Sequence, residues 1–299
     1  MTPPDDASDA PTAEPAEAGP GPHAGPALEL RGLRYRYPGA AVDALAGVDL
    51  AVAVGESVAV VGANGSGKST LARLLGGLER PASAESAVVC GHDLLTDDGR
   101  MAARRDVGVL FQNPENQLVA QCVEEDVAFG LENLRWRPDD MRRRVDAMLA
   151  RFQLTDLRSR EPHLLSGGQK QRTALAGVLA VPRRVVVLDE PTAMLDPAGR
   201  EEVLQAVAGL RADGLTVVLV TQEMDEVVGV DRVVALEAGS VAYEGGVSGL
   251  FADTALIGRL GLALPAAADL ALELAARGRS LKPLPLTLDE LTTALEASG

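Results

Sequence analysis

Aromatic residues, cysteines and positive charges are all scarce in this chain of 299 residues. Aromatic residues make up only 3% of it, so a core must be built mainly from Val, Leu and Ala. Cys90 and Cys122 lie far apart in the sequence, which excludes a disulfide framework or a cysteine metal cluster and suits a reducing cytosol. With 28 basic against 43 acidic residues and no block of Lys and Arg, the sequence disfavours broad binding to nucleic acid.

Long hydrophobic runs are also missing. A membrane-spanning helix requires about 18 apolar residues, whereas the best runs here, such as 185–188 and 215–220, have the length of strands. Residues 1–27 are rich in Pro, Ala, Gly and acidic side chains, and they lack both the positive and the apolar region of a signal peptide. We therefore expect a chain that does not itself cross a membrane and that begins with a disordered acidic tail over 1–27.

Short Val-rich runs alternate with helical patterns from residue 28 to 249, which predicts an α/β domain with a mainly parallel sheet. Residues 57–61, 107–111, 185–188 and 215–220 read as buried strands. A helical insertion is expected over about 115–165. From about 250 the composition shifts to Ala and Leu, and Thr287 with Glu290 forms a capping box that predicts a final helix with Leu288, Leu291 and Leu295 on one face.

A phosphate-binding loop follows the strand at 57–61. Its glycines allow backbone N–H groups to curl around phosphate oxygens, and the following helix adds the partial positive charge of its N-terminus. Lys68 would reach the terminal phosphates and Ser69 would ligate Mg²⁺. The candidate phosphate-binding residues are Gly62, Ala63, Asn64, Gly65, Ser66, Gly67, Lys68, Ser69 and the adjoining Thr70.

Two carboxylates, Asp189 and Glu190, end the apolar run at 185–188. A buried parallel strand delivers its C-terminal residues to the crevice where ligands bind. Asp189 is therefore placed to hold Mg²⁺, directly or through water, and Glu190 to polarise an attacking water.

A third motif, Leu165 followed by Ser166, Gly167, Gly168 and Gln169, offers a helix cap and bare backbone N–H groups, which make a second anion site. This motif resembles the signature of ATP-binding cassette proteins. The resemblance implies a P-loop ATPase with the nucleotide-binding fold of that family, a helical insertion and a small C-terminal helical appendage. It also implies a head-to-tail dimer in which the signature of one subunit closes on the P-loop site of the other.

The resemblance assigns further residues by position. Tyr37 resembles the aromatic that stacks on adenine, in preference to Tyr35, while Gln112 resembles the glutamine that touches Mg²⁺ and senses the membrane partner. Asp196 resembles the aspartate that crosses the dimer interface. After the strand at 215–220 the family has a Thr-His pair, but this chain has Thr221 and Gln222. An amide can donate a hydrogen bond to a phosphate but cannot carry a positive charge or shuttle a proton.

The stretches 108–117 and 123–130 look like the ATPase subunit of energy-coupling factor transporters, which import vitamins and transition-metal ions. That resemblance covers roughly residues 28–297. It implies ATP and Mg²⁺ as cofactors, a second ATPase subunit, a transmembrane coupling protein, a small substrate-binding membrane protein, and a place at the cytoplasmic face of the membrane.

Two surfaces are expected to meet these partners. The acidic residues Glu115, Glu124, Glu125 and Asp126 would pair with basic residues on the coupling helices of the membrane protein, the alternative being a solvated helix face. Residues 250–299 would contribute to dimerisation, the alternative being packing against their own domain.

Two other functions stay open. One is a soluble cassette ATPase that remodels ribosomes or DNA, although such proteins usually carry two cassettes or a long coiled coil. The other is a catalytically weak regulatory half of a heterodimer, for which Gln222 is the support.

Overall fold

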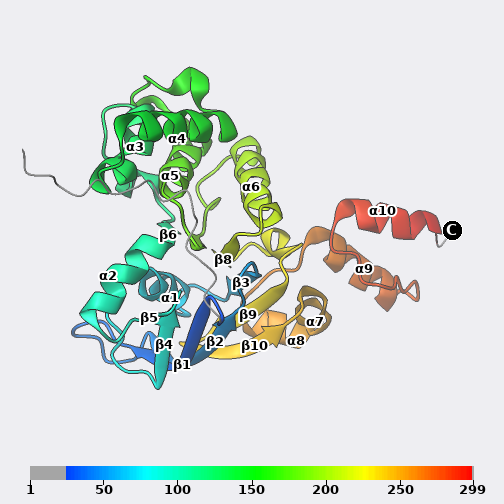
Figure 1. The fold of residues 1–299 in the computed structure, drawn as a ribbon. Coiled ribbons are helices and arrows are strands. Elements are labelled where there is room, and N and C mark those ends of the chain that lie inside the picture. Colours follow the sequence, from blue (N-terminus) through cyan, green and yellow to red (C-terminus); the bar gives the residue numbers. More distant parts are fainter. Residues whose placement is uncertain (1–24, 298–299) are drawn as a thin grey trace, which may run out of the picture.

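Two β-sheets form the body of the protein, and helices cover both faces of the larger one (Figure 1). The computed structural model describes residues 25–297. Its strands are β1 Leu28–Tyr35, β2 Leu45–Val52, β3 Ser57–Val61, β4 Ser86–Val89, β5 His92–Asp93, β6 Val107–Leu110, β7 Val185–Asp189, β8 Thr216–Val220, β9 Arg232–Glu237 and β10 Ser240–Gly245. Its helices are α1 Lys68–Leu75, α2 Asp97–Asp106, α3 Val123–Asn133, α4 Pro138–Arg151, α5 Gly167–Ala180, α6 Pro197–Ala212, α7 Val247–Ala252, α8 Thr254–Arg259, α9 Ala266–Ala276 and α10 Leu288–Ala297, with short 3₁₀ turns η1 Pro114–Asn116, η2 Thr155–Leu157, η3 Pro162–Leu164 and η4 Met224–Val227.

The larger sheet has the strand order β10-β9-β3-β8-β7-β6, and all its pairs are parallel except β10 with β9. Alternate residues of its strands enter different cores. On β7, for example, Val185 and Val187 face one core while Val186 and Leu188 face another. Because both faces are buried, these strands read as continuous apolar runs. The predicted α/β class and the four predicted strands are confirmed, with ends shifted by one residue at most.

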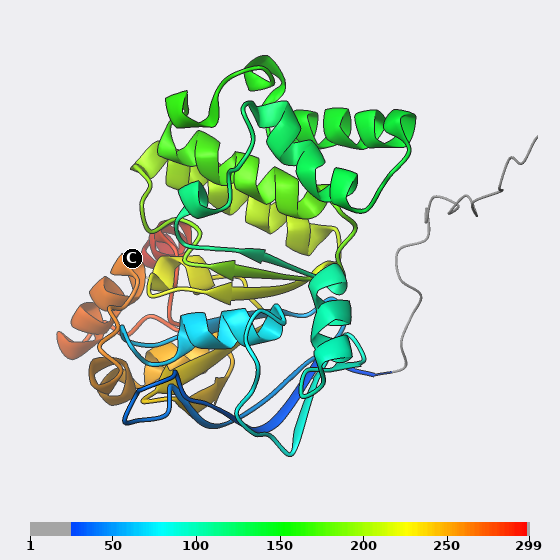
Figure 2. The ribbon, with the colours of Figure 1, turned by 90° about the vertical axis from the view of Figure 1, so that its left-hand side faces the viewer.

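The second sheet is antiparallel, with the order β2-β1-β4-β5, and it was not anticipated from the sequence. It packs against α1 and the same face of the larger sheet, so that α1 lies between the two sheets (Figure 2). The register of β1 with β2 shifts between Leu30 and Leu33, where Gly32 has a φ of +59°. This bulge interrupts the alternation by which an exposed strand is recognised.

A helical layer made of α3, α4, α5 and α6 covers the other face of β6, β7 and β8 (Figure 2). Pro138 occupies the first turn of α4, where a missing N–H costs nothing, and Val145, Met148 and Leu149 form its buried stripe. Phe152, directly after the helix, is 2% exposed and completes that stripe. The helices α3 and α4 lie in the stretch where the insertion was expected.

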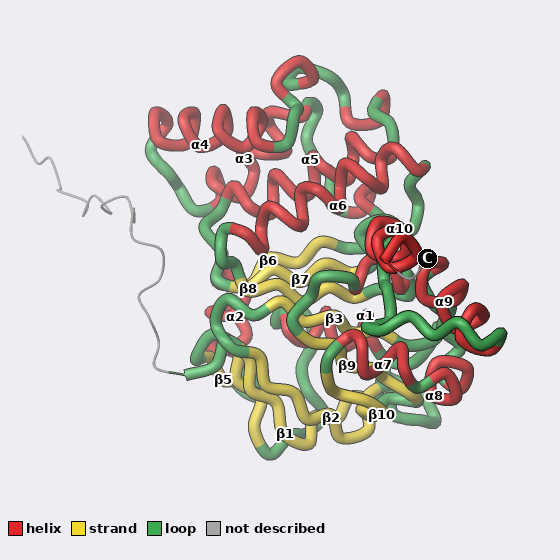
Figure 3. The backbone as a smooth tube through the Cα atoms, turned by 90° about the vertical axis from the view of Figure 1, so that its right-hand side faces the viewer, coloured by secondary structure: helices red, strands yellow, loops and turns green. Residues whose placement is uncertain are grey.

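The C-terminal region divides into two parts (Figure 3). Helices α7 and α8 share a core with β3 and β9, since Leu250, Phe251 and Ile257 pack on Ala59 and Val61. Helices α9 and α10 have a small core of their own, built around Ala267, Ala271, Leu281 and Leu291.

The expected features at the two ends of the chain have different outcomes. Of the predicted apolar face of α10, Leu291 is buried and Leu295 packs beside it, but Leu288 is 67% exposed. The chain's own core therefore covers Leu291 but not Leu288, and a dimerisation role for this face stays a prediction. The hydroxyl of Thr287 accepts from the backbone N–H of Glu290 at 3.2 Å, which is one of the two hydrogen bonds of the predicted capping box.

The expected disordered tail falls, for residues 1–24, outside the described residues. No helix of the described part is long and apolar enough to cross a membrane.

Candidate nucleotide-binding and catalytic site

The loop between β3 and α1 is shaped by glycines that no other residue could replace. Gly62 has a φ of +145° and Gly67 a φ of +106°. A Cβ on Gly62 would lie 2.3 Å from the carbonyl oxygen of Leu236, and one on Gly67 would lie 2.5 Å from that of Ala44. The chain therefore turns tightly at the C-terminal edge of the sheet and enters α1 at Lys68, with Ala63, Asn64 and Gly65 exposed.

Lys68 is buried within this loop, where its Nζ donates to the carbonyl oxygens of Gly62 at 2.7 Å and Ala63 at 3.1 Å. Burial lowers the pKa of Lys68, while the nearby Glu190 and Asp189 oppose that shift. The next residue, Ser69, donates its hydroxyl to Oδ1 of Asp189 at 3.1 Å. Burial raises the pKa of Asp189, and the Ser69 hydrogen bond opposes it.

Glu190 lies between two amides that come from different loops. Nε2 of Gln112 donates to Oε2 of Glu190 and Nε2 of Gln222 donates to Oε1, each at 2.6 Å. The same Gln222 amide donates to Oδ1 of Asn64 at 2.8 Å, so it joins the phosphate-binding loop to Glu190. Glu190 has a φ of +47°, a conformation that costs energy for a residue with a Cβ. Its backbone N–H donates to the carbonyl of Val220 at 2.8 Å, which holds it at the edge of the sheet.

The two tyrosines ahead of the loop differ in exposure. Tyr35 is 6% exposed and donates its hydroxyl to Glu79 at 2.9 Å. Tyr37 is 38% exposed, rests on Tyr35 with ring centroids 4.9 Å apart at 89°, and shares a 3.1 Å hydrogen bond with the hydroxyl of Thr70. Tyr37 is thus fixed beside the first turn of α1 with part of its ring open to solvent.

The signature residues and Asp196 lie on a different surface. Ser166 caps α5 and forms a reciprocal capping box with Gln169. Gly168 lies against Gly199 of α6, because a Cβ there would be 2.9 Å from the Gly199 Cα. Asp196 caps α6 through the backbone N–H of Gly199 at 2.9 Å. Within residues 25–297, no hydrogen bond or ion pair links residues 166–169 or the Asp196 side chain to the phosphate-binding loop or Glu190, and Ser166, Gly167 and Asp196 are exposed.

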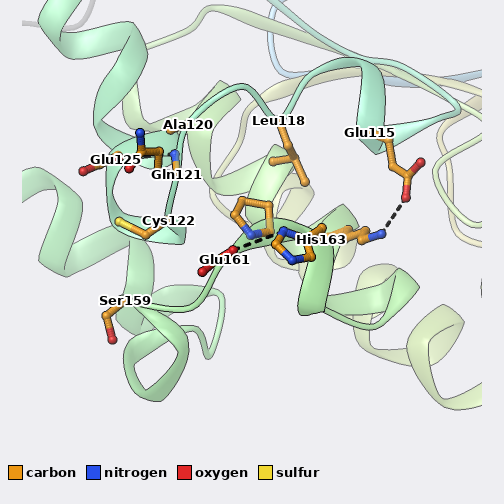
Figure 4. Close-up of a pocket in the computed structure, with 11 residues that line it drawn as sticks. Glu115, Leu118, Ala120, Gln121, Cys122, Glu125, Ser159, Glu161 and His163 are labelled. Carbon is orange, nitrogen blue, oxygen red and sulfur yellow. Dashed lines mark hydrogen bonds and ion pairs between the residues drawn. The ribbon is translucent and has the colours of Figure 1, made fainter.

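A groove of about 770 Å³ opens on the helical layer and contains part of the acidic run (Figure 4). Glu115 and Glu125 line it, together with Glu161, His163 and Lys170. Glu115 is paired with Lys170 at its rim, and this pairing lowers the pKa of Glu115. The groove therefore exposes carboxylates among apolar and basic side chains.

The expectation that four acidic side chains face a partner was wrong for Asp126. Asp126 is 7% exposed, and its Oδ1 accepts from the backbone N–H groups of Val119 and Ala120 at 2.8 and 3.1 Å. Burial raises its pKa. Glu124 is held by Arg158 at 2.6 Å. A short charged run on a helix points in several directions, and Asp126 shares a buried face with Val123, which lies three residues before it.

One cluster near the site was not anticipated. Glu226, in η4, is 4% exposed and accepts hydrogen bonds from the hydroxyls of Thr192 and Thr221. Arg200 of α6 lies 3.3 Å from the same carboxylate. A single Glu in a polar turn carries no sequence signal for such a role.

The fold and this site define a P-loop nucleotide-binding protein, since a glycine-rich loop leads from a parallel strand into a helix beside two strand-end carboxylates. The family model described as ABC transporter matches residues 45–193. The chain is 42% identical to the energy-coupling factor transporter ATP-binding protein EcfA1 of Clostridium novyi over 90% of this chain and 97% of that protein. It is 47% identical to EcfA1 of Symbiobacterium thermophilum, over 90% and 96% of the two chains.

Solved structures agree with these relatives. CbiO1 from Clostridium perfringens, described as part of the ABC transporter complex CbiONQ, matches with a TM-score of 0.70 and 34% identity over 82% of this chain and 98% of that one. The ATP-binding cassette MJ0796, in a dimeric post-hydrolysis state bound to ADP and Pi, matches with a TM-score of 0.67 and 29% identity, over 74% of this chain and 98% of that one. The chain belongs to the ABC transporter family of ATPases, among the energy-coupling factor transporter ATP-binding proteins.

Proposed function

We propose that this chain binds and hydrolyses ATP as one of the two ATPase subunits that power an energy-coupling factor importer of a vitamin or a transition-metal ion. The observation that carries the proposal is the Glu190 carboxylate, held by two amides beside the phosphate-binding loop. EcfA1 relatives that match over 90% of this chain and at least 96% of their own length support the choice of transporter class.

The nucleotide lies across the loop at 62–70. Backbone N–H groups of the glycine-rich turn and the N-terminus of α1 bind its phosphates. Lys68 leaves the carbonyls of Gly62 and Ala63 for the terminal phosphates, an exchange favoured because its charge is poorly solvated where it now lies. Tyr37 offers its exposed ring to the adenine.

The oxygen donors beside Lys68 suit Mg²⁺. Mg²⁺ prefers hard oxygen ligands and is usually held by one or two carboxylates together with substrate phosphates. Ser69 and Asp189 already lie within 3.1 Å of each other, and Gln112 reaches toward the same edge. These three residues would hold the ion, which would supply charge neutralisation to the phosphates.

Glu190 takes the proton of the attacking water, and its two amide partners fix its orientation. Gln222 contributes geometry rather than charge, because an amide donates a hydrogen bond but does not titrate. General-base catalysis of this kind contributes about 10²- to 10⁴-fold to a rate.

The surface made by residues 166–169 and Asp196 completes the site of a second ATPase subunit. Its exposure and its separation from the chain's own Glu190 support this role, as does the dimeric form of MJ0796. Helices α9 and α10, with exposed Leu270 and Leu288, add to the pairing of subunits.

The groove on the helical layer receives a basic coupling helix of a transmembrane protein, with Glu125 and Glu161 as the charged contacts. That protein joins the ATPase pair to a small substrate-binding membrane protein. The chain thereby sits peripherally at the cytoplasmic face of the membrane.

The test is ATP turnover by the purified chain, alone and assembled with the transmembrane coupling protein. Turnover that needs Glu190 and rises on assembly supports the proposal. Co-purification with ribosomes in place of membranes contradicts it. A regulatory half-subunit is the second candidate, favoured by Gln222, and it predicts that Glu190→Gln leaves the turnover of the assembly unchanged.

A further inference from the structure

Glu226 connects three segments that each carry part of the site. Its Oε1 accepts from the hydroxyl of Thr192, which follows Glu190 by two residues. Its Oε2 accepts from the hydroxyl of Thr221 at 2.7 Å, and Thr221 directly precedes Gln222. The side chain of Glu226 is fully buried, and both threonines are nearly so.

The third segment is the start of α6. Nη2 of Arg200 lies 3.3 Å from Oε1 of Glu226, and Nη1 lies 3.4 Å from Glu223. The backbone N–H of Arg200 donates to Asp196, so this ion pair ties Glu226 to the helix that Asp196 caps. A buried carboxylate without such partners is destabilising, so the two hydroxyl donors, the Arg200 cation and the carboxylate depend on one another.

The two loops leave the sheet side by side. Asp189 of β7 pairs with Val220 of β8, and the chain then turns at Glu190 and at Thr221. A cavity of about 140 Å³ lies between the loops and is lined by Glu190, Gln222 and the two threonines, with Ala193 and Glu223. The backbone N–H of Glu190 joins the loops to each other at the edge of the sheet through the carbonyl of Val220, and behind the cavity the two threonine hydroxyls join them a second time through Glu226.

We propose that Glu226 is a positioning residue that fixes the distance between Glu190 and Gln222 by binding Thr192 and Thr221 at once. It touches neither of the two site residues. It holds the two loops that carry them at a fixed separation, and its ion pair with Arg200 links those loops to α6. The inference rests on the proposed function, because Glu190 and Gln222 must act in hydrolysis for the distance to matter.

The two threonines act in series, because both are needed for the bridge through Glu226. Removing either hydroxyl breaks that bridge, so removing the second as well has no further effect on it. We expect Thr192→Val and Thr221→Val each to lower kcat by about 10- to 100-fold, the range for a small misplacement of catalytic groups. The double variant should fall to the same level, and the KM for ATP should stay within about twofold, because the phosphate-binding loop keeps its own contacts.

The conservative variant Glu226→Gln distinguishes a role of Glu226 in holding the two loops together from a role in folding alone. Glu226→Gln keeps a side chain that can accept from one hydroxyl and donate to the other, so it should retain most of the kcat that Glu226→Ala loses. Thr216→Val is the matched control, because Thr216 is 1% exposed and its hydroxyl accepts from the backbone N–H of Gly55 at the end of β8 away from Thr221. It should leave kcat unchanged while shifting the melting temperature by a similar amount.

The experiment measures kcat, KM and melting temperature for these variants in the assembled transporter. Equal kcat for the two single variants and the double variant supports the proposal. Effects that multiply, or kcat losses that follow the melting temperature in all variants including Thr216→Val, overturn it while leaving the proposed function intact. Absence of ATP turnover in the wild-type assembly overturns the proposed function as well.

Discussion

The amide of Gln222 donates to Glu190 at 2.6 Å and to Asn64 at 2.8 Å, so one side chain spans the gap between the Glu190 carboxylate and the loop at 62–70. This position is a histidine in the cassette family. The bond geometry explains how glutamine can stand there, since both acceptors are reached by a single NH₂ group.

Removing this amide should lower turnover. In Gln222→Ala both bonds are lost and Glu190 keeps only Gln112, so we expect kcat to fall by about 10-fold or more, with little change in the melting temperature of this partly exposed site. Steady-state ATPase assays on the assembled transporter measure it. Unchanged kcat would mean that the bonds of Gln222 have no part in hydrolysis.

Restoring a histidine tests whether charge matters as well as geometry. If the chain pairs with itself and chemistry limits the rate, Gln222→His should raise turnover, by up to the roughly 10²-fold lower end of a proton-transfer role. If it pairs with a subunit that has the histidine, the complex should contain one slow and one fast site, and disabling the partner's catalytic glutamate should cost more than Glu190→Gln. No gain in a homodimer whose rate is limited by chemistry would show that glutamine already does the work of the histidine.

The buried Asp126 should make stability depend on pH. Burial raises its pKa above the ordinary value of 3.8, so the folded chain binds this proton more tightly than the unfolded chain does. The contribution of Asp126 to the free energy of unfolding is therefore present at low pH and is lost as the pH rises through its raised pKa. Asp126→Asn keeps an oxygen for Val119 and Ala120 but does not ionise, so its melting temperature relative to wild type should improve as the pH rises from about 4 to about 7.

Glu132→Gln is the control for this measurement, because it removes an exposed carboxylate from the same helix. A melting-temperature difference for Asp126→Asn that is flat across the pH range would contradict the argument.

The C-terminal region should respond to truncation in two stages. Removing residues after 264 leaves α7 and α8 in the main core, so the chain should fold but form fewer dimers without ATP. Removing residues after 250 takes away Phe251 and Ile257 and exposes Ala59 and Val61 beside the phosphate-binding loop, so the melting temperature should drop sharply. Sedimentation velocity distinguishes the two, and an unchanged profile for the shorter deletion would exclude a role of α9 and α10 in dimerisation.

One negative charge of the groove can be reversed without changing any residue of the ATP site. Glu125→Lys should weaken binding of the membrane coupling protein by about 10-fold, more at low salt than at high salt, because it places a cation where a basic helix is expected. Glu132→Lys makes the same change on α3 outside the groove and should bind normally. Equal affinities for the two variants in a pull-down titration would refute the docking site.

Local signals predicted part of this structure well. The glycine-rich loop and the buried strands could be located because each is encoded by a few consecutive residues. The antiparallel sheet was missed, since its strands are exposed on one face and β1 is interrupted at Gly32. Contacts such as Gln222 with Asn64, separated by 158 residues, or Glu226 with Thr192, depend on how the loops meet in space. No single stretch of sequence contains them.

The burial of individual helix residues was equally hard to predict. Periodicity placed Leu288 and Leu291 of α10 on one face, but the partner surface provided by Ala267, Ala271 and Leu281 is small and covers only the second. The same limit explains Asp126, whose charge suggested the surface although its neighbours on α3 are buried.

The most direct test of the account is the fate of ATP in Glu190→Gln and Lys68→Ala, measured in the assembled transporter with the partner site disabled if the partner is a different chain. Glu190→Gln should bind ATP as wild type does and hydrolyse it about 10²- to 10⁴-fold more slowly, because the loop that binds phosphate is intact and the base is gone. Lys68→Ala should lose ATP affinity, and Glu201→Gln, an exposed change on α6, should behave as wild type. Normal turnover by Glu190→Gln would contradict the central claim that this carboxylate activates the attacking water.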